Sequence, residues 1–392
     1  MANKHHETRV GIILTGGGAR AAYQVGVLKA IADILPRDAA NPFKIITGSS
    51  AGAINAAALA CYSANYRDAV RRILQIWANF RSNHVYRTDL AGIAGTGARW
   101  LASMFVGGLG KNNPHCLLNR APLRALLEKY IHTNNIQEAV DKGYIHALSV
   151  SASGYSSHQS VSFFHAHPSV ESWARSRRVG SRSPITIDHL MASSAIPFLF
   201  EAIKVHREFF GDGSMRQIAP LSPALHLGAD RILVIGNRQE DNFQPKRVSN
   251  PPHPSLGQIA GHALDSIFLD SLEADLERLQ RINRTVDLIP EDTREEHGIA
   301  LRKVEVMVIS PSQDMGEIAV QYTDQLPRTI RFLLRGLGAS KKNGSSLISY
   351  LLFEKGYTRA LIDLGYQDAT QKKAEILDFL SGKTGAEVKP DR

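Results

Sequence analysis

Short apolar runs alternate with a longer mixed segment over the first fifty residues, and glycines follow each run. The runs Val10–Leu14 and 43–46 are rich in branched residues, so each predicts a buried strand. Between them, residues 22–31 have the apolar spacing of a helix. This order predicts a βαβ unit, in which the carboxyl ends of two parallel strands meet at one edge of a sheet.

The alternation continues along the chain. Residues 66–80 have helical spacing, and apolar runs at 145–153, 161–166 and 232–235 predict further strands. We therefore expect an α/β fold of three layers, with a mainly parallel central sheet flanked by helices.

A proline-rich stretch predicts a boundary within the chain. We expect a polar tail at 1–9, a catalytic domain at 10–240 and a linker at 241–255. Helical spacing over 256–282, 347–364 and 368–380, with one strand at 303–310, predicts a mainly helical extension at 256–381. The acidic residues of its first helix are typical of a solvated face. The composition of 382–392 predicts a disordered tail.

One segment, residues 89–110, allows two interpretations. Six glycines interrupt its apolar positions. The segment is either a mobile flap over a site or a buried helix with loose ends.

The second apolar run is followed by the pentad Gly48-Ser49-Ser50-Ala51-Gly52. In a Gly-x-Ser-x-Gly pentad between a strand and a helix, the serine sits on a sharp turn that exposes its hydroxyl. Gly48 and Gly52 remove side chains that would collide at such a turn. The spacing predicts a nucleophilic Ser50, although an ordinary turn with a capping serine has the same pattern.

The first run is followed by Gly16, Gly17, Gly18, Ala19 and Arg20, which fit two functions. One is the dinucleotide fingerprint, which requires an acidic residue at the end of the second strand. That strand ends in the serine pentad instead, which disfavours a nucleotide-dependent oxidoreductase. The other function is an oxyanion hole, because free N–H groups at the start of a helix stabilise a tetrahedral intermediate.

Ser50 needs a base to act as a nucleophile near neutral pH. His226, His253 and His262 could complete a Ser-Asp-His order, but none follows a recognisable strand. Asp212 follows an aromatic run and lies between two glycines, Gly211 and Gly213, where a tight turn can present its carboxylate. A plain Asp-Gly turn is the alternative.

Together these motifs resemble the patatin-like phospholipase family, and closely its bacterial members. The glycine loop is similar to the family's oxyanion motif, the pentad to its nucleophile elbow, and Asp212-Gly213 to the motif of its catalytic aspartate. The block 191–200 is similar to the family block that precedes that aspartate. The resemblance covers roughly the first 240 residues. Ala21 and Ser214 replace residues that are usually Gly, and Gly or Ala, in the family.

The resemblance implies a lipid acyl hydrolase with a Ser-Asp dyad, formed here by Ser50 and Asp212. It implies an acyl-enzyme intermediate, a lipid substrate, and no cofactor or metal. A nucleotide-dependent oxidoreductase and a catalytically idle lipid-binding protein of the same fold remain as alternatives.

Length and composition agree with a soluble enzyme. The chain has 392 residues, of which 43% are hydrophobic, and two cysteines, which do not form a disulfide framework. The N-terminal residues lack the apolar core of a signal peptide, and no run is long enough to span a bilayer. We expect a cytoplasmic protein, either free or bound peripherally at the inner face of the membrane.

The net charge of +9 favours an anionic partner. No nucleic-acid motif is present. Arg175, Arg177, Arg178 and Arg182 cluster next to Trp173. This cluster is either a solvated loop or a contact with an anionic membrane, in which the arginines bind phosphates and the indole lies at the interface.

Overall fold

The computed structural model describes residues 8–88, 116–239, 253–269, 271–299, 301–339 and 344–382. The segment 89–110 lies outside these ranges, as do most of the linker and most of both predicted tails. The two interpretations of 89–110 and the expectations for the tails therefore stay predictions.

Ten strands of the described residues form one sheet, in the order β10-β9-β1-β2-β3-β4-β6-β5, with β8 beside β3 and β7 beside β8. The five strands from β10 to β3 run parallel, whereas β4 and β8 run antiparallel to β3. The fold class predicted from the sequence is confirmed. The strands are β1 (Val10–Leu14), β2 (Ile45–Ser49), β3 (Ala147–Gly154), β4 (Ser160–Ala166), β5 (Trp173–Arg175), β6 (Arg178–Arg182), β7 (Ile203–Val205), β8 (Glu208–Asp212), β9 (Arg231–Ile235) and β10 (Glu305–Ile309).

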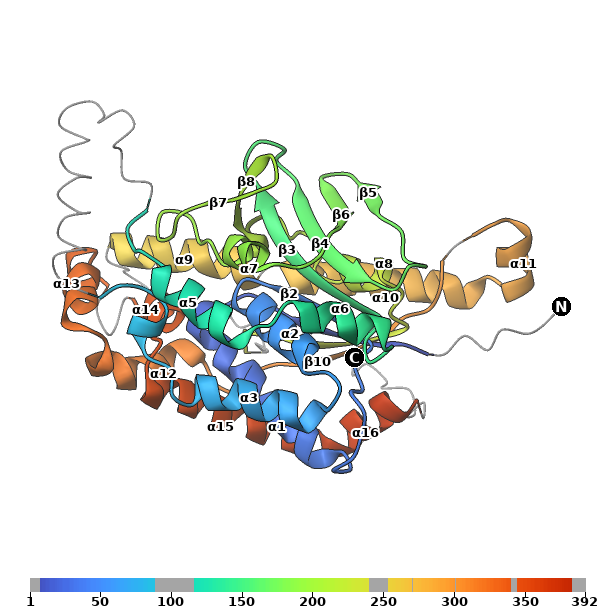
Figure 1. Ribbon diagram of the computed structural model, residues 1–392, viewed down its shortest axis with the longest axis horizontal. Helices are drawn as coiled ribbons and strands as arrows, with labels where there is room; N and C mark the ends of the chain where they lie inside the picture. Colours follow the sequence, from blue (N-terminus) through green and yellow to red (C-terminus); the bar gives the residue numbers. More distant parts are fainter. Residues whose placement is uncertain are drawn as a thin grey trace.

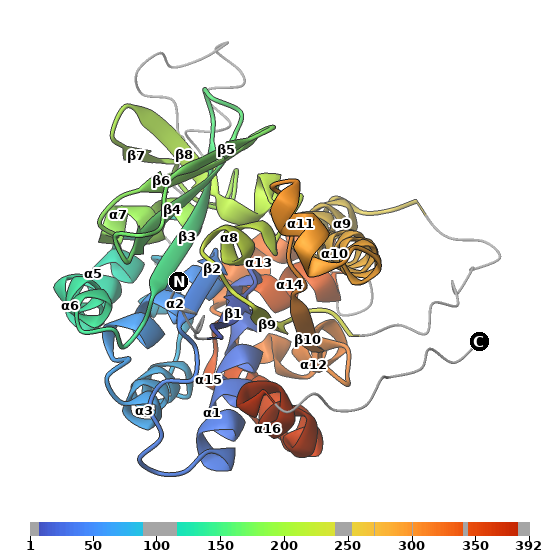
Figure 2. The ribbon, with the colours of Figure 1, turned by 90° about the vertical axis from the view of Figure 1, so that its right-hand side faces the viewer.

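Helices cover both faces of the sheet. Figure 1 shows α8 and α10 above β10 and α1 and α15 below it, and Figure 2 shows α8 and α10 above β1, β9 and β10 and α1 and α15 below them. The helices are α1 (Ala22–Ile34), α2 (Ala51–Cys61), α3 (Tyr66–Trp77), α5 (Ala121–Tyr130), α6 (Asn134–Asp141), α7 (Ile187–Ser193), α8 (Ser222–His226), α9 (Leu256–Leu269), α10 (Ser271–Leu288), α11 (Glu291–Glu296), α12 (Met315–Tyr322), α13 (Arg328–Gly336), α14 (Ser345–Leu351), α15 (Lys355–Gln371) and α16 (Lys373–Ser381). Two short 3-10 helices, η1 (Gly18–Ala21) and η4 (Gly213–Arg216), lie at the site.

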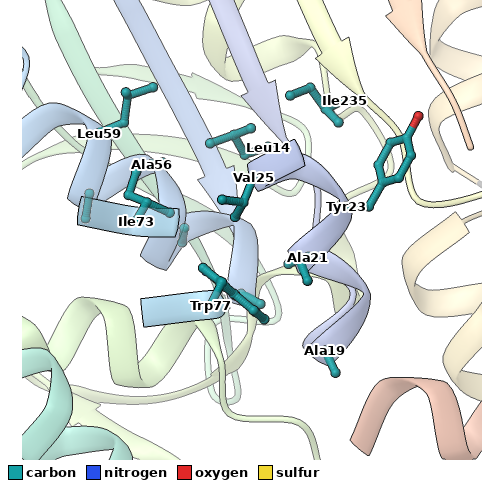
Figure 3. Close-up of a cluster of buried hydrophobic side chains, with 14 of the residues drawn as sticks. Leu14, Ala19, Ala21, Tyr23, Val25, Ala56, Leu59, Ile73, Trp77 and Ile235 are labelled. Carbon is teal, nitrogen blue, oxygen red and sulfur yellow. The ribbon is translucent and has the colours of Figure 1, made fainter. Parts of the chain in front are cut away.

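Side chains on the two faces of β1 pack in two different hydrophobic cores. Ile12 and Leu14 pack in the larger core with α1, α2 and α3, whereas Ile13 packs in the smaller core with α8. This is the pattern of a strand buried on both faces, and it explains why the strand is a continuous apolar run. Figure 3 shows Leu14, Val25 and Ala56 in the larger core.

The predicted extension is part of the same sheet and core. Strand β10 pairs in parallel with β9, and α15 packs along α1. Within that contact the Tyr23 hydroxyl donates to Asp368 over 2.9 Å, and Lys29 lies 3.7 Å from the centre of the Tyr366 ring. The C-terminal part therefore supports the elements that carry the site.

One helix prediction is wrong. The helical spacing over 347–364 is divided between α14 and α15, because the chain turns to place Phe353 against the rings of Phe80 and Tyr86. Here tertiary packing overrides a continuous helical pattern. The predicted helix at 256–282 is helical in α9 and α10, and residue 270 between them lies outside the described residues.

Candidate active site

Ser50 lies at the junction of β2 and α2 with φ 54° and ψ −130°, which non-glycine residues rarely adopt. This strain is typical of a nucleophile elbow, where a sharp turn lifts a serine out of the sheet. Gly52 lets the turn close, since a Cβ there would lie 2.1 Å from the carbonyl oxygen of Leu14. Gly48 is in β2 and faces the Gly52 backbone. We call residues 48–52 the elbow.

The carboxylate of Asp212 lies beside the elbow. Asp212 ends β8, which pairs with the last residues of β3. The Ser50 hydroxyl donates to Oδ2 of Asp212 over 2.6 Å. Oδ1 accepts a bond of 2.9 Å from the N–H of Ser214, which follows Gly213 at the start of η4. A serine and a carboxylate that are 162 residues apart in the sequence are thus hydrogen-bonded.

The histidines considered from the sequence lie elsewhere. His226 stacks on Trp173, with ring centroids 4.8 Å apart. His253 contacts the carbonyl oxygen of Pro254, and His262 borders a separate cavity. Over the described ranges, no histidine forms a hydrogen bond with Ser50 or Asp212.

Burial sets the protonation of Asp212. The side chain is fully buried, which raises its pKa from 3.8 to about 6. Hydrogen bonds from Ser50 and Ser214, and the positive charge of Arg120, act in the opposite direction. At neutral pH the carboxylate is therefore mainly ionised, with a pKa close enough to 7 for efficient proton transfer.

Arg120 is a buried cation near this carboxylate that the sequence interpretation missed. Its guanidinium donates to the carbonyl oxygens of Met191 and Glu201 and to the Ser194 hydroxyl, at 2.9, 2.9 and 3.1 Å. Burial lowers its pKa to about 10, so it remains protonated. In the sequence, the position of Arg120 directly before α5 was its only distinguishing feature. No local pattern predicts that it is buried.

Ser193 supports the elbow and was also missed. Its hydroxyl accepts a bond of 2.9 Å from the Ser50 N–H and donates over 2.6 Å to the carbonyl oxygen of Ser151. Ser193 ends α7 and belongs to the block 191–200, for which the sequence suggested no role. The bridge fixes the elbow backbone relative to β3.

The glycine loop, residues 16–20, follows β1 and faces the elbow. We call it the oxyanion loop, for the function proposed below. Among the described residues, nothing accepts a hydrogen bond from the N–H groups of Gly17 or Gly18. The Asn237 side chain donates to the carbonyl oxygen of Gly16. Gly18 has φ +54°, and a Cβ there would lie 2.4 Å from the carbonyl oxygen of Tyr350. The loop thus presents free donors beside Ser50.

Ala19 and Arg20 complete the loop within η1, and both are buried. The Arg20 guanidinium does not point to solvent. It donates to Ser349, Tyr350, Ser346 and Asp265 of the C-terminal part.

An apolar cavity of about 270 Å³ opens beside Ser50. Its walls come from α2, α3, α5, the segment between α7 and β7, and the end of α14 with the segment that follows it. Representative wall residues are Ile54, Ile73, Trp77, Leu127, Phe200 and Phe353. A cavity of this kind suits a long apolar group joined to a polar centre at Ser50.

The basic cluster forms a β-hairpin, β5 and β6, rather than a loop. Trp173 is packed between Phe164 and His226, at 5.0 and 4.8 Å between ring centroids. Arg182 donates to the carbonyl oxygens of Ala166, His167 and Val170. The side chains of Trp173 and Arg182 therefore make their contacts within the folded protein.

The remaining arginines of the hairpin differ in exposure. Arg175 and Arg177 are exposed, whereas Arg178 is half-buried. The sequence pattern of four arginines near one tryptophan within residues 173–182 did not separate these environments.

The patatin-like phospholipase family model matches residues 12–225, which is more than half of the chain. The chain therefore belongs to the patatin-like phospholipase family. No curated protein matches it in sequence.

Solved structures of two other proteins are similar to it. One is human GIVD cytosolic phospholipase A2 in complex with methyl gamma-linolenyl fluorophosphonate, at 13% identity and a TM-score of 0.43, covering 96% of this chain and 59% of that chain. The other is VipD from Legionella pneumophila, at 12% identity and a TM-score of 0.36, covering 94% of this chain and 67% of that chain. This chain thus spans less than two thirds of the length of the human protein.

Within the part of the chain that the structure describes, none of the helices has both the length and the apolar character needed to span a bilayer.

Proposed function

We propose that this protein is a serine lipid acyl hydrolase that cleaves carboxylic esters of phospholipids or related lipids. The observation that carries the proposal is the 2.6 Å hydrogen bond from a strained Ser50 to the buried carboxylate of Asp212. Family membership and the apolar cavity beside Ser50 support it.

The reaction proceeds in two halves. Asp212 accepts the proton of Ser50 as Oγ attacks the ester carbonyl carbon, and the N–H groups of Gly17 and Gly18 stabilise the resulting oxyanion. The tetrahedral intermediate expels the alcohol, which takes the proton from Asp212. Water then attacks the acyl-enzyme while Asp212 accepts its proton, and collapse returns that proton to Ser50 as the fatty acid leaves. No cofactor or metal has a role in this sequence.

The cavity supplies the binding energy for the acyl chain. Its apolar walls remove the chain from water, and each buried methylene contributes about 0.8 kcal/mol. Because the cavity begins at Ser50, an acyl chain within it places the ester carbonyl at the nucleophile.

The proposal includes a cytoplasmic location and peripheral contact with an anionic membrane. Of the residues named for such contact, Arg175 and Arg177 are exposed on the hairpin and can reach phosphate groups. Because the indole of Trp173 packs between two other rings of the protein, we do not propose it as a membrane contact.

Covalent labelling tests the nucleophile. A fluorophosphonate probe should label the wild type and fail to label Ser50→Ala. Ser63→Ala, a buried serine away from Asp212, is the matched control and should be labelled normally. Labelling that survives Ser50→Ala rules out Ser50, and lipid binding without any labelling indicates an idle lipid-binding protein.

A lipid panel with product analysis by mass spectrometry tests the bond that is cleaved. Release of free fatty acid from the wild type but not from Ser50→Ala is expected. A cofactor absorbance that persists through purification, with no released fatty acid, would favour the oxidoreductase instead.

A further inference from the structure

The oxyanion loop ends in an arginine that is buried against the C-terminal part of the chain. The Arg20 side chain is only 6% exposed. Its Nε donates to the Ser349 hydroxyl over 2.7 Å, and its Nη1 donates to the Tyr350 hydroxyl over 3.1 Å. The guanidinium also lies 4.0 Å from the centre of the Tyr350 ring. All these contacts come from α14.

The carboxylate of Asp265, on α9, accepts hydrogen bonds from Arg20 and from α14. Its Oδ1 accepts from Arg20 over 3.3 Å and from the Tyr350 hydroxyl over 2.9 Å, and its Oδ2 accepts from Ser346 over 2.6 Å. One carboxylate therefore joins α9, α14 and the oxyanion loop. We call Arg20, Asp265, Ser346, Ser349 and Tyr350 the clamp.

The backbone of the loop rests on the same two helices. Gly18 is so close to Tyr350 that a Cβ would lie 2.4 Å from its carbonyl oxygen, and the ring of Phe268 lies against Gly16. Phe268 and Tyr350 also pack together, with ring centroids 5.1 Å apart. Both ends of the loop are thus supported by α9 and α14, which lie outside the residues 12–225 that match the family.

We infer that Asp265 is a positioning residue for the oxyanion loop. Free N–H donors stabilise an oxyanion only if they are already aimed at it, because reorientation during the reaction would cost the energy that they supply. Asp265 holds Arg20, and Arg20 holds the turn in which Gly17 and Gly18 lie. This inference rests on the proposed function and extends the machinery beyond the part of the chain that the family match covers.

Two substitutions at Asp265 test the inference with a soluble short-chain ester. Asp265→Ala should lower kcat by about 100-fold with KM nearly unchanged, and should slow fluorophosphonate labelling of Ser50 to a similar extent. Asp265→Asn keeps an acceptor oxygen but loses the charge, so its kcat should lie between those of the wild type and the alanine variant.

A matched ion pair at the opposite end of the parallel strands provides the control. Asp230 pairs with Arg302 over 2.8 Å, so Asp230→Asn should lower stability without lowering kcat. Tyr350→Phe keeps the ring and removes one hydroxyl, so it should fold and lose kcat several-fold. The inference is overturned if Asp265→Ala has the same kcat as the Asp230→Asn control. If Asp265→Ala does not fold, Tyr350→Phe takes its place in this comparison. A wild type that is never labelled overturns the proposed function instead.

A second surface, on α13, is independent of the clamp. One side of this helix is buried through Ile330 and Leu334. The other side carries Arg328, Arg331, Phe332 and Arg335, at the i, i+3, i+4 and i+7 positions of a single stripe. Phe332 is 81% exposed, and Arg331 also pairs with Asp324 over 3.7 Å.

We propose that this stripe of α13 docks on an anionic membrane surface. Arginines bind lipid phosphates, and an exposed aromatic ring among them adds an apolar contact with the layer beneath the phosphates. The neighbouring helix position Thr329 donates to the carbonyl oxygen of Thr88, which follows His84 and Val85 in the cavity wall. This proposal also rests on the proposed function, since a lipid substrate must reach that cavity.

Sedimentation with phosphatidylcholine vesicles, with and without phosphatidylglycerol, tests the docking surface. Phe332→Ser should reduce binding to anionic vesicles at all salt concentrations. The triple variant Arg328→Ser, Arg331→Ser and Arg335→Ser should reduce binding to anionic vesicles mainly at low salt. Hydrolysis of a soluble ester should stay normal in both variants, and Ser50→Ala should bind vesicles as the wild type does.

The double variant Arg175→Ser with Arg177→Ser on the hairpin separates the two candidate contacts, and it should reduce binding less than the α13 variants do. Reduced binding in the hairpin variant and normal binding in the α13 variants would move the contact to the hairpin and overturn the proposal. Equal binding of all variants, or no binding by the wild type, would also overturn it.

Discussion

The elbow and the oxyanion loop follow neighbouring strands, yet different parts of the chain hold them in place. The elbow is fixed by its own backbone and by one bridge from Ser193, within the residues that match the family. The oxyanion loop depends on Arg20 and on partners from Asn237 onward. A turn between two regular elements can store strain locally, whereas a loop that leaves its N–H groups free has few bonds of its own and needs outside support.

The largest effect should come from removing the base on the elbow side. Asp212→Asn should lower kcat/KM by roughly 10²–10⁴-fold, because the proton acceptor of Ser50 is lost. Steady-state kinetics with a soluble ester measure this. His226→Ala, His253→Ala and His262→Ala are the controls and should keep most activity. A comparable loss at any one histidine would contradict the Ser-Asp dyad.

The same substitution should increase stability at neutral pH. The folded-state pKa of Asp212, about 6, exceeds its ordinary value of 3.8, so the folded state binds the proton more tightly. The stability of the wild type therefore falls as the pH rises from about 4 to about 6, by about 3 kcal/mol from this group. Denaturant unfolding of both proteins at pH 4 and pH 7 should show Asp212→Asn gaining that amount relative to the wild type. An equal difference at both pH values would show that burial does not raise this pKa.

The loop side should be sensitive to one added methyl group. Gly18→Ala combines a left-handed backbone with a collision at the Tyr350 carbonyl, whereas Gly143 has φ +70° and nothing within 4 Å of an added Cβ. Gly143→Ala should lower the free energy of unfolding by about 1 kcal/mol. Gly18→Ala should cost about 2 kcal/mol more and should also lower kcat. Equal stability losses would mean that α14 does not constrain the loop.

Arg120 should shift the pH profile. Because Asp212 must be ionised to accept the proton, kcat/KM should fall as the pH drops through about 6. Arg120→Met removes the positive charge that lowers the pKa of Asp212. The acid limb of the kcat/KM profile should therefore move up by about one pH unit. Arg120→Lys keeps the charge and should leave the limb in place. A limb that moves equally in both variants would assign the shift to lost packing.

The smallest effect should report the strain of the elbow. Glycine adopts the φ of residue 50 without steric cost, whereas alanine does not. Ser50→Gly should therefore exceed Ser50→Ala in free energy of unfolding by about 1 kcal/mol, as measured by denaturant titration. Equal stabilities would mean that the elbow stores no strain.

The elements nearest the motifs could be predicted from the sequence. The run Val10–Leu14 matches β1 in both bounds, because a strand buried on both faces leaves a continuous apolar run between polar residues. Ser50 and Asp212 could be selected because each lies on a turn whose glycines are visible locally. The structure brings the two side chains together, while their catalytic roles remain proposals.

The supports of the site could not be predicted, because they depend on distant contacts. Arg20 and Asp265 are 245 residues apart, and no local pattern links them. Ser193 and Arg120 look like ordinary polar residues until the fold buries them. The hairpin at Trp173 was similarly ambiguous, since an aromatic residue among arginines has the same pattern on a membrane-facing loop and in a packed sheet edge.

The clamp also orders events during synthesis of the chain. When residue 225 has been made, Ser50, Asp212 and all three glycines of the loop already exist, but Asp265 and Tyr350 do not. On the proposed function, the nascent chain at this point holds Ser50 and Asp212 without a frame for the N–H groups of the oxyanion loop. We therefore expect ester cleavage at its full rate only after α14 has been translated and has docked.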